Sequence, residues 1–284
     1  MIRIGILGYG NLGKYLYEEL STLPNFEIAF IWNRTRSKLI DDKIPAEKIL
    51  ENISDLENFN PKADLIIEVA QNILENYAEV ILKHADVFIG SPTALAKEDV
   101  EKIMKNLCAP EKYARRVYIG RGALYGAEDI RIMAESGSLK ALKITMTKDP
   151  SHLHVQPELI PLRDQAAKTN QKTILYEGPV RNLCPLAPKN VNTMATASFA
   201  ASNLGLDKVT GCLVADPNIG SFHQVLVECF GPEQADGRQF KVTTDRMNPA
   251  PMGEVTGRQT YIGFLSSVKR ACLKKEEVGK FHVI

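Results

Sequence analysis

Over roughly the first 120 residues, short apolar runs alternate with polar segments that have helical spacing. A leucine stripe at three- and four-residue spacing follows the first run and stops at Pro24, which predicts an amphipathic helix. Strands that alternate with helices predict a parallel sheet covered on both faces, an α/β doubly wound domain. The five runs are Ile2–Leu7, Phe26–Trp32, Asp64–Val69, Asp86–Ile89 and Val117–Ile119.

After Gly126 the pattern changes to alternating or continuous apolar stretches, and no clear helix stands between the first two of them. Several strands that pair without crossover helices predict an antiparallel or mixed sheet, and therefore a second domain of the α+β class. A segment rich in Ala, Ser and Thr, Asn192–Asn203, predicts a helix that neighbours can approach closely. The strands are expected at Lys140–Thr147, Thr173–Val180, Gly211–Ala215, Gln224–Phe230 and Gln239–Thr244.

The last helix carries an apolar stripe from Tyr261 to Cys272, and we expect it to pack back on the first domain. The predicted boundaries are 1–124 for the first domain, completed by 254–284, and 125–253 for the second. A chain of 284 residues is long enough for two such domains.

Composition narrows the classes of partner. Thirty-five Lys and Arg against 34 Asp and Glu leave a formal charge of +1, too little to hold a nucleic acid or an anionic membrane. No apolar run is long enough to span a bilayer and no charged leader opens the chain, so we expect a cytoplasmic protein. The five cysteines are scattered and odd in number, and His152 with His154 is too small a set, so no metal site is predicted.

The segment Gly8–Gly13 reads Gly-x-Gly-x-x-Gly between a predicted strand and a predicted helix. In that context the first glycine permits a tight turn, the second lets a pyrophosphate approach the backbone, and the third allows close packing of helix and strand. The helix N-terminus adds free N–H groups and a positive dipole. The motif predicts a dinucleotide-binding domain.

The end of the second predicted strand indicates which dinucleotide is bound. An acidic residue there would bond the NAD ribose, but Trp32–Arg36 contains no carboxylate. Arg34 could stack on adenine, while Arg34, Thr35 or Arg36 binds a 2′-phosphate. We therefore favour NADP with NAD as an alternative, the other interpretation being two solvated surface arginines.

Candidate catalytic and substrate-binding residues lie in the second domain. His223 follows a loop and precedes a strand, and an imidazole with an ordinary pKa of about 6.5 can exchange a proton near neutrality. Arg181 and Lys189 are nearby cations suited to a substrate carboxylate, or else surface charges. Asn190 and Asn192 open the small-residue helix, either as N-caps or as amides that hold the nicotinamide or the substrate.

Taken together, several strings resemble the L-aspartate dehydrogenase family, most closely its animal branch, over nearly the whole chain. They are Gly8–Gly13, Ile31–Arg34, Asp64–Ala70, Gly90–Leu95, Arg121–Asp129, Tyr176–Arg181, Ala187–Asn192 and Ala215–Pro217 leading to His223.

The resemblance implies a Rossmann domain joined to a mixed-sheet catalytic and oligomerisation domain. It implies oxidation of L-aspartate by NAD(P) to iminoaspartate, which water converts to oxaloacetate and ammonia, with His223 as the acid/base. The family's Gly-Ala pair falls on Ala123, and its Asn-x-Asn pair on Asn192 with Asn190 as the adjacent alternative. The cofactor contacts expected in total are Gly8, Gly10, Asn11, Leu12, Gly13, Asn33, Arg34, Thr35, Ala70, Ser91, Ala123, Asn190 and Asn192.

Two other functions remain open at this point. One is an NAD(P)-linked dehydrogenase of another small amino or hydroxy acid, because one fold serves many substrates. The other is a non-catalytic NADP-binding sensor that keeps the glycine turn. Both functions are compatible with a homo-oligomer, and we expect a dimer.

Overall fold

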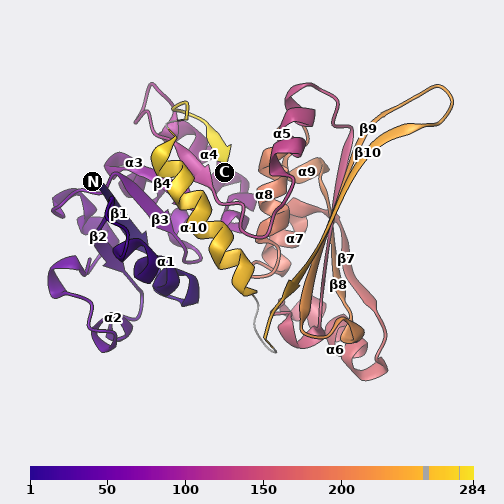
Figure 1. Ribbon diagram of the computed structural model, residues 1–284, viewed down its shortest axis with the longest axis horizontal. Helices are drawn as coiled ribbons and strands as arrows, with labels where there is room; N and C mark the ends of the chain where they lie inside the picture. The colour runs from indigo at the N-terminus through magenta and orange to yellow at the C-terminus, as the bar shows by residue number, and fades with distance from the viewer. Residues whose placement is uncertain (252–255, 275) are drawn as a thin grey trace. The chain divides into compact units, whose positions relative to one another are not determined.

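The computed structural model of the chain describes residues 1–251, 256–274 and 276–284. It divides into two compact units (Figure 1). The first contains Met1–Gly120, Gly263–His282 and Ile284, and the second contains Arg121–Ile262 and Val283. The chain therefore leaves the first unit once and returns to it.

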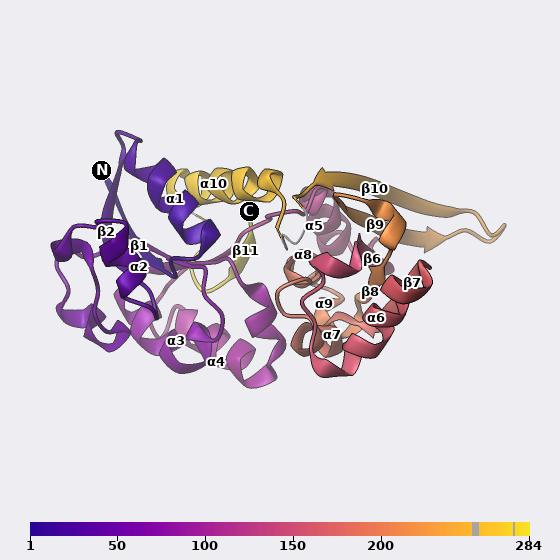
Figure 2. The ribbon, with the colours of Figure 1, turned by 90° about the horizontal axis from the view of Figure 1, so that it is seen from below.

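The first unit is built on a six-stranded sheet in the order β11-β5-β4-β3-β1-β2, and β1 to β5 pair in parallel. Helices α1 and α10 lie on one side of this sheet and α3 and α4 on the other (Figure 2). The predicted doubly wound α/β fold is confirmed. The strands are β1 (Ile2–Leu7), β2 (Phe26–Trp32), β3 (Leu65–Glu68), β4 (Asp86–Ile89), β5 (Val117–Ile119) and β11 (Phe281–Val283), and the helices are α1 (Asn11–Ser21), α2 (Ser37–Asp41), α3 (Ile73–His84), α4 (Glu98–Cys108) and α10 (Arg258–Leu273).

The core of this unit joins β1 and β3 to the C-terminal helix. Phe264 and Val268 of α10 belong to the same buried cluster as Ile6 and Ile67. The ring of Phe264 meets Phe88 edge-on, with 6.2 Å between ring centroids. A Cβ added at Gly120 would lie 2.7 Å from the Phe264 ring, so the absence of a side chain there lets α10 approach the strand ends.

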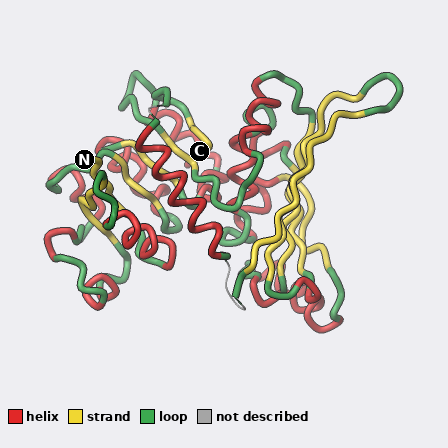
Figure 3. Tube along the Cα trace, viewed as in Figure 1, coloured by secondary structure: helices red, strands yellow, loops and turns green. Residues whose placement is uncertain are grey.

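The second unit is built on a five-stranded sheet in the order β10-β9-β6-β8-β7. Strands β6 and β8 are parallel and the other neighbours are antiparallel, so the predicted mixed sheet is confirmed. Helices α5, α7, α8 and α9 gather on one face of this sheet (Figures 1 and 3). The strands are β6 (Ala141–Lys148), β7 (Thr173–Pro179), β8 (Thr210–Ala215), β9 (Phe222–Glu233) and β10 (Gln239–Pro249), and the helices are α5 (Ala127–Glu135), α6 (Ile160–Thr169), α7 (Val180–Leu186), α8 (Asn192–Ala200) and α9 (Gly205–Lys208).

Two features of this unit differ from the sequence expectation. Helix α6 lies between β6 and β7, where no helix was expected. Ala166 alone is buried among its residues, so α6 has no apolar stripe by which the sequence would predict it. Strand β9 is longer at both ends than expected, β10 is longer at its C-terminal end, and the hairpin that they form projects beyond the neighbouring strands (Figure 3). Its distal residues are paired with each other rather than buried, so they lack the apolar signal of a core strand.

Short 3₁₀ turns occur in the loops of both units. They are Ala46–Lys48, Ile53–Asn58, Pro92–Ala96, Pro150–His152, Pro157–Leu159 and Pro217–Ile219. Among the described residues, no helix has the length and apolar character that crossing a membrane requires.

Candidate active site

The glycine turn between β1 and α1 is fixed to the end of β2 by backbone and amide hydrogen bonds. Gly8 has a φ of 117° and donates its N–H to the Trp32 carbonyl oxygen over 2.8 Å. The N–H of Tyr9 donates to Asn33 Oδ1 over 3.1 Å, and Asn33 Nδ2 donates to the Thr35 carbonyl oxygen over 2.9 Å. Asn33 thus positions the turn through its side chain.

The glycines of this turn have the shape that a pyrophosphate requires. A Cβ added at Gly13 would overlap with the carbonyl oxygen of Gly8, so the third glycine is needed for the turn itself. A Cβ added at Gly10 would meet no atom within 4 Å, and no side chain caps helix α1 at that residue. The open backbone at the helix N-terminus fits the diphosphate of a dinucleotide.

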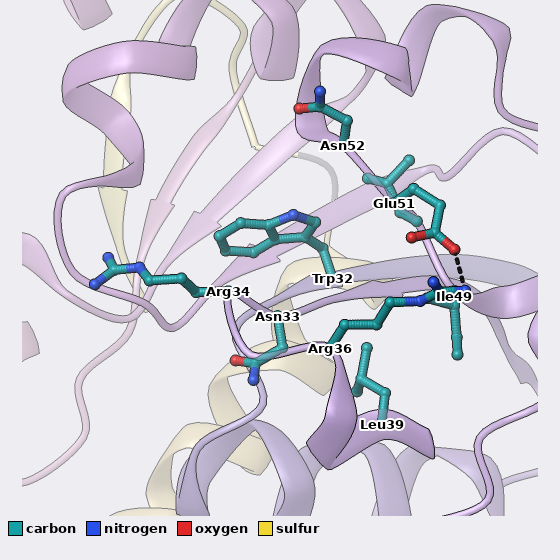
Figure 4. Close-up of a pocket in the computed structure, with 9 residues that line it drawn as sticks. Trp32, Asn33, Arg34, Arg36, Leu39, Ile49, Glu51 and Asn52 are labelled. Atoms are coloured by element: carbon teal, nitrogen blue, oxygen red, sulfur yellow. Dashed lines mark ion pairs between the residues drawn. The ribbon is translucent and has the colours of Figure 1, made fainter.

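A cavity of about 330 Å³ lies beside the carboxyl end of β2 (Figure 4). Arg36 contributes to its wall but forms an ion pair with Glu51. Arg34 is exposed, points away from that pair, and has no ion-pair partner among the described residues. The cavity is lined by Trp32, Asn33, Arg34, Arg36, Leu39, Ile49, Leu50, Glu51 and Asn52.

A buried carboxylate joins the ends of β3 and β4. Glu68 Oε1 accepts the N–H of Ala70 over 2.9 Å, and Glu68 Oε2 accepts the N–H of Ser91 over 3.2 Å. Burial raises the pKa of Glu68 to about 7, against the opposing effect of these donors. Two of the predicted cofactor contacts, Ala70 and Ser91, are therefore held by one side chain that sequence reasoning had not selected.

In the second unit, a row of polar side chains crosses the sheet where β6 and β10 end and β9 begins. Lys148 of β6 and Asn248 of β10 are both paired in register with His223 of β9. Lys148, His223 and Asn248 are 2%, 4% and 4% exposed. Positions in register on neighbouring strands share a face of the sheet, so these three side chains form one buried row.

Hydrogen bonds from two loops extend this row. His223 Nε2 lies 3.1 Å from Nδ1 of the fully buried His152. Lys148 Nζ donates to Asn190 Oδ1 over 3.3 Å, and Asn190 Nδ2 donates to the His154 carbonyl oxygen over 2.7 Å.

Burial lowers the pKa of Lys148 to about 7. His152 and His223 are in contact, so protonating both imidazoles would place two positive charges side by side. Protonation of both rings at once is therefore unfavourable. The arrangement can hold and release a proton near neutral pH.

Comparison with known proteins gives consistent matches. Residues 129–267 match the model of the family described as aspartate dehydrogenase, C-terminal. An aspartate dehydrogenase domain-containing protein of Xenopus tropicalis is 44% identical, covering 94% of this chain and 93% of the relative. The L-aspartate dehydrogenase of Archaeoglobus fulgidus is 30% identical, covering 79% of this chain and 81% of the relative. The chain belongs to the aspartate dehydrogenase family.

The fold agrees with this membership. The crystal structure of aspartate dehydrogenase from Thermotoga maritima matches with a TM-score of 0.65 at 23% identity, covering 96% of this chain and 95% of that one. The protein is thus an aspartate dehydrogenase-like oxidoreductase, and membership of the family implies a nicotinamide cofactor.

Within this aspartate dehydrogenase fold, the predicted residues of the second unit are only partly brought together. Asn190 joins the row through Lys148, whereas Asn192 is the first residue of α8 and Ala123 lies in the loop before α5. Lys189 is exposed next to Asn190.

Arg181 follows β7 at the opposite end of the sheet. Pro179 pairs with Thr210 at the start of β8, whereas it is Ala215 at the other end of β8 that pairs with Lys148. The Arg181 guanidinium binds both carboxylate oxygens of Asp207, with Nε to Oδ1 at 2.6 Å and Nη2 to Oδ2 at 2.9 Å. The structure therefore does not bring Arg181 to His223.

Sequence reasoning missed Lys148, His152 and Asn248. Lys148 extends the alternation of Leu142, Ile144 and Met146, so its burial could have been predicted from the period of the strand. His152 was considered only as a metal ligand together with His154, and only the turn Pro150–His152 carries it back to His223.

Proposed function

We propose that this protein oxidises L-aspartate with NAD(P) to iminoaspartate, which water then converts to oxaloacetate and ammonia. The observation that carries the proposal is the buried row of Lys148, His223 and Asn248 with His152 against it, in a chain of the aspartate dehydrogenase family. Proton-exchanging groups shielded from water are what amine oxidation requires of the protein.

His223 is the acid/base in this proposal. In its neutral form it accepts the proton that the substrate amine loses as the imine forms. The contact with His152 supports this role, because repulsion between two charged imidazoles favours a neutral member of the pair. The chemistry supplied by a bound nicotinamide is acceptance at C4 of the hydride that leaves the substrate α-carbon.

The first unit is proposed to hold the dinucleotide. Gly8, Gly10, Asn11, Leu12 and Gly13 would bind its diphosphate through backbone N–H groups, and the open surface at Gly10 supports this. Ala70 and Ser91, at the ends of β3 and β4, are proposed as further cofactor contacts, and so are Ala123, Asn190 and Asn192. Arg34 and Thr35 would bind the 2′-phosphate, so we propose NADP as the preferred cofactor.

A cation for the substrate carboxylates is also part of the proposal. Lys189 remains a candidate by its place beside Asn190, and Arg181 is a weaker one because Asp207 occupies its guanidinium. The second domain as predicted from the sequence, 125–253, would serve catalysis and assembly. Exposed apolar residues on its strands, among them Ile174, Phe240 and Met247, support a homodimer, which light scattering would test.

The decisive experiment measures formation of reduced cofactor by absorbance with purified protein and L-aspartate. Reactions with NAD and NADP run separately, and D-aspartate, L-glutamate and L-homoserine serve as comparison substrates. We expect turnover confined to L-aspartate. Turnover on another member of the panel would indicate a different dehydrogenase, and NADPH binding without any turnover would indicate a sensor.

His223→Ala tests the proposed mechanism. We expect it to lose most of the turnover, at least about 100-fold, because general acid–base catalysis contributes that much, while the affinity for the cofactor is kept. The matched control is His154→Ala, which removes an exposed imidazole from the same unit. Unchanged turnover in His223→Ala would remove this residue from the mechanism.

A further inference from the structure

Arg246 of β10 is partly exposed as a residue, but the ends of its guanidinium are buried and have no counter-charge among the described residues. Its Nη1 and Nη2 atoms are both shielded from solvent and have no hydrogen-bond partner there. Burial lowers the pKa of Arg246, which reflects the loss of water around the guanidinium. Buried guanidinium groups in proteins are ordinarily paired, so this one needs an explanation.

The position of Arg246 relates it to the buried row. Arg246 pairs with Val225, and two residues further along the strand Asn248 pairs with His223. Residues two apart share one face of a strand and lie about 6.6 Å apart along it. Arg246 is therefore the next position of β10 on the face that carries Asn248 and His223.

The neighbouring carboxylate is turned away from Arg246. Asp245 occupies the opposite face of β10, and both of its carboxylate oxygens accept Gln224 Nε2 at 3.0 Å. Among the described residues, no Asp or Glu forms an ion pair with Arg246. In the described part of the chain, the guanidinium of Arg246 is therefore not neutralised by a neighbouring acid.

Tyr125 holds the guanidinium by its face. The Arg246 Cζ atom lies 4.9 Å from the centroid of the Tyr125 ring. Stacking of this kind uses the π-face of a guanidinium and leaves the N–H groups at its edge for an acceptor in the same plane. A carboxylate fits such an edge with two parallel hydrogen bonds.

We propose that Arg246 binds a carboxylate of the substrate. The inference rests on the proposed function, since it assigns the residue that would recognise a dicarboxylic amino acid. A bidentate contact with one carboxylate would satisfy both buried nitrogens and supply the missing negative charge. The Nη1 and Nη2 atoms of Arg246 are shielded from solvent, as donors that meet a substrate in a water-excluding site would be.

The test measures succinate binding to the full-length protein with saturating NADPH, by isothermal titration calorimetry. Succinate has two carboxylates but no amine, so it reports anion binding without turnover. We expect Arg246→Met to weaken succinate binding at least about tenfold, and Arg246→Lys to fall between Arg246→Met and the wild type. The control is Arg238→Met, which removes an arginine side chain that is 83% exposed at the tip of the same hairpin.

Thermal melting separates binding from a structural role. Because Arg246→Met removes a partly desolvated charge that has no counter-ion among the described residues, its melting temperature should equal or exceed that of the wild type. A lower melting temperature with unchanged succinate affinity would mean that Arg246 only stacks on Tyr125, and would overturn the inference. If Arg246→Met does not fold, the Arg246→Lys variant is tested instead. Wild-type succinate affinity in that variant would also overturn the inference.

Kinetics distinguish failure of this inference from failure of the proposed function. If the wild type oxidises L-aspartate and Arg246→Met keeps the wild-type KM, the inference is wrong and the proposed function stands. If the wild type turns over no substrate but loses succinate binding on Arg246→Met, the proposed function is wrong and the carboxylate site stands.

Discussion

The fold changes the protonation of Lys148 from that of an ordinary lysine side chain. An ammonium in water has no reason to release its proton near pH 7, but burial in the second unit brings the pKa of Lys148 to about 7. The unfolded chain therefore holds a proton at this residue between about pH 7 and 10.5 that the folded chain has released. Stability must rise with pH across that window, because the unfolded state binds the additional proton.

Lys148→Met should remove this pH dependence. From pH 7 to pH 9 the contribution of Lys148 to the free energy of unfolding is roughly 2 kcal/mol, so the difference between wild type and variant should change by that amount. Urea unfolding at the two pH values measures it, and contributions of other groups cancel in the comparison. Lys140→Met, at an exposed lysine before the same strand, should behave as the wild type. Equal differences at both pH values would contradict the lowered pKa.

Gly10 offers a residue-scale test of the phosphate turn. Its φ of −83° suits any residue and an added Cβ meets nothing within 4 Å, so Gly10→Ala should fold normally. A bound diphosphate would meet the new methyl group, and we expect the KM for the cofactor to rise about tenfold or more, since the backbone approach is lost. Melting curves and cofactor titration measure the two effects. A variant with wild-type cofactor affinity would show that the diphosphate does not approach Gly10.

Some residues of the candidate site could be predicted from the sequence and others could not. The glycine turn was predictable, because its constraints are steric and involve neighbours in sequence. Glu68 and His152 were not selected, because each owes its state to burial by segments distant in the chain. The burial of Lys148 follows from strand alternation, but its contact with Asn190 depends on a distant segment. His223 was selected from its loop context and from family resemblance, and its contact with His152 emerged only from the fold.

At the scale of elements, the strands of the parallel sheet were predicted almost residue by residue. Runs such as Phe26–Trp32 and Asp86–Ile89 are buried on both faces, so their apolar character starts and stops with the strand. Helix α6 and the outer parts of β9 and β10 lack that signal, because they are only partly buried. Pattern reasoning recovers elements in proportion to how much of their surface the core covers.

The end of β2 is the element that should determine cofactor choice. Arg34 has a guanidinium with no ion pair among described residues, whereas Arg36 is held by Glu51. Arg34→Ala should raise the KM for NADP by about tenfold or more, because charged hydrogen bonds to a 2′-phosphate are lost, and should leave the KM for NAD nearly unchanged. Steady-state kinetics with each cofactor measure the ratio, with Arg36→Ala as the control. An equal effect on both cofactors would exclude recognition of the 2′-phosphate by Arg34.

At the scale of the whole molecule, the first unit is assembled from two distant stretches of chain. The chain leaves this unit at Gly120 and returns at Gly263, and residues of α10 fill the core against β1 and β4. Residues at the far end also take part, since Ser267 Oγ donates to the Ile284 carbonyl oxygen over 2.7 Å and the Ile284 N–H donates to the Ile119 carbonyl oxygen. The first unit therefore depends on sequence that follows the second unit.

Phe264→Ala tests that dependence. The Phe264 ring is 6% exposed and packs on Phe88, so its removal leaves a cavity between α10 and the sheet and should cost about 3–5 kcal/mol of unfolding free energy. The matched control is Ile262→Ala on the same helix, where the side chain is 45% exposed and truncation should change stability little. Urea unfolding measures the stability and NADPH titration the binding. Because the core of the first unit supports the glycine turn, Phe264→Ala should lose cofactor binding at lower urea concentration than the control. If both variants unfold at the same urea concentration, the C-terminal helix is not part of the core that holds the first unit together.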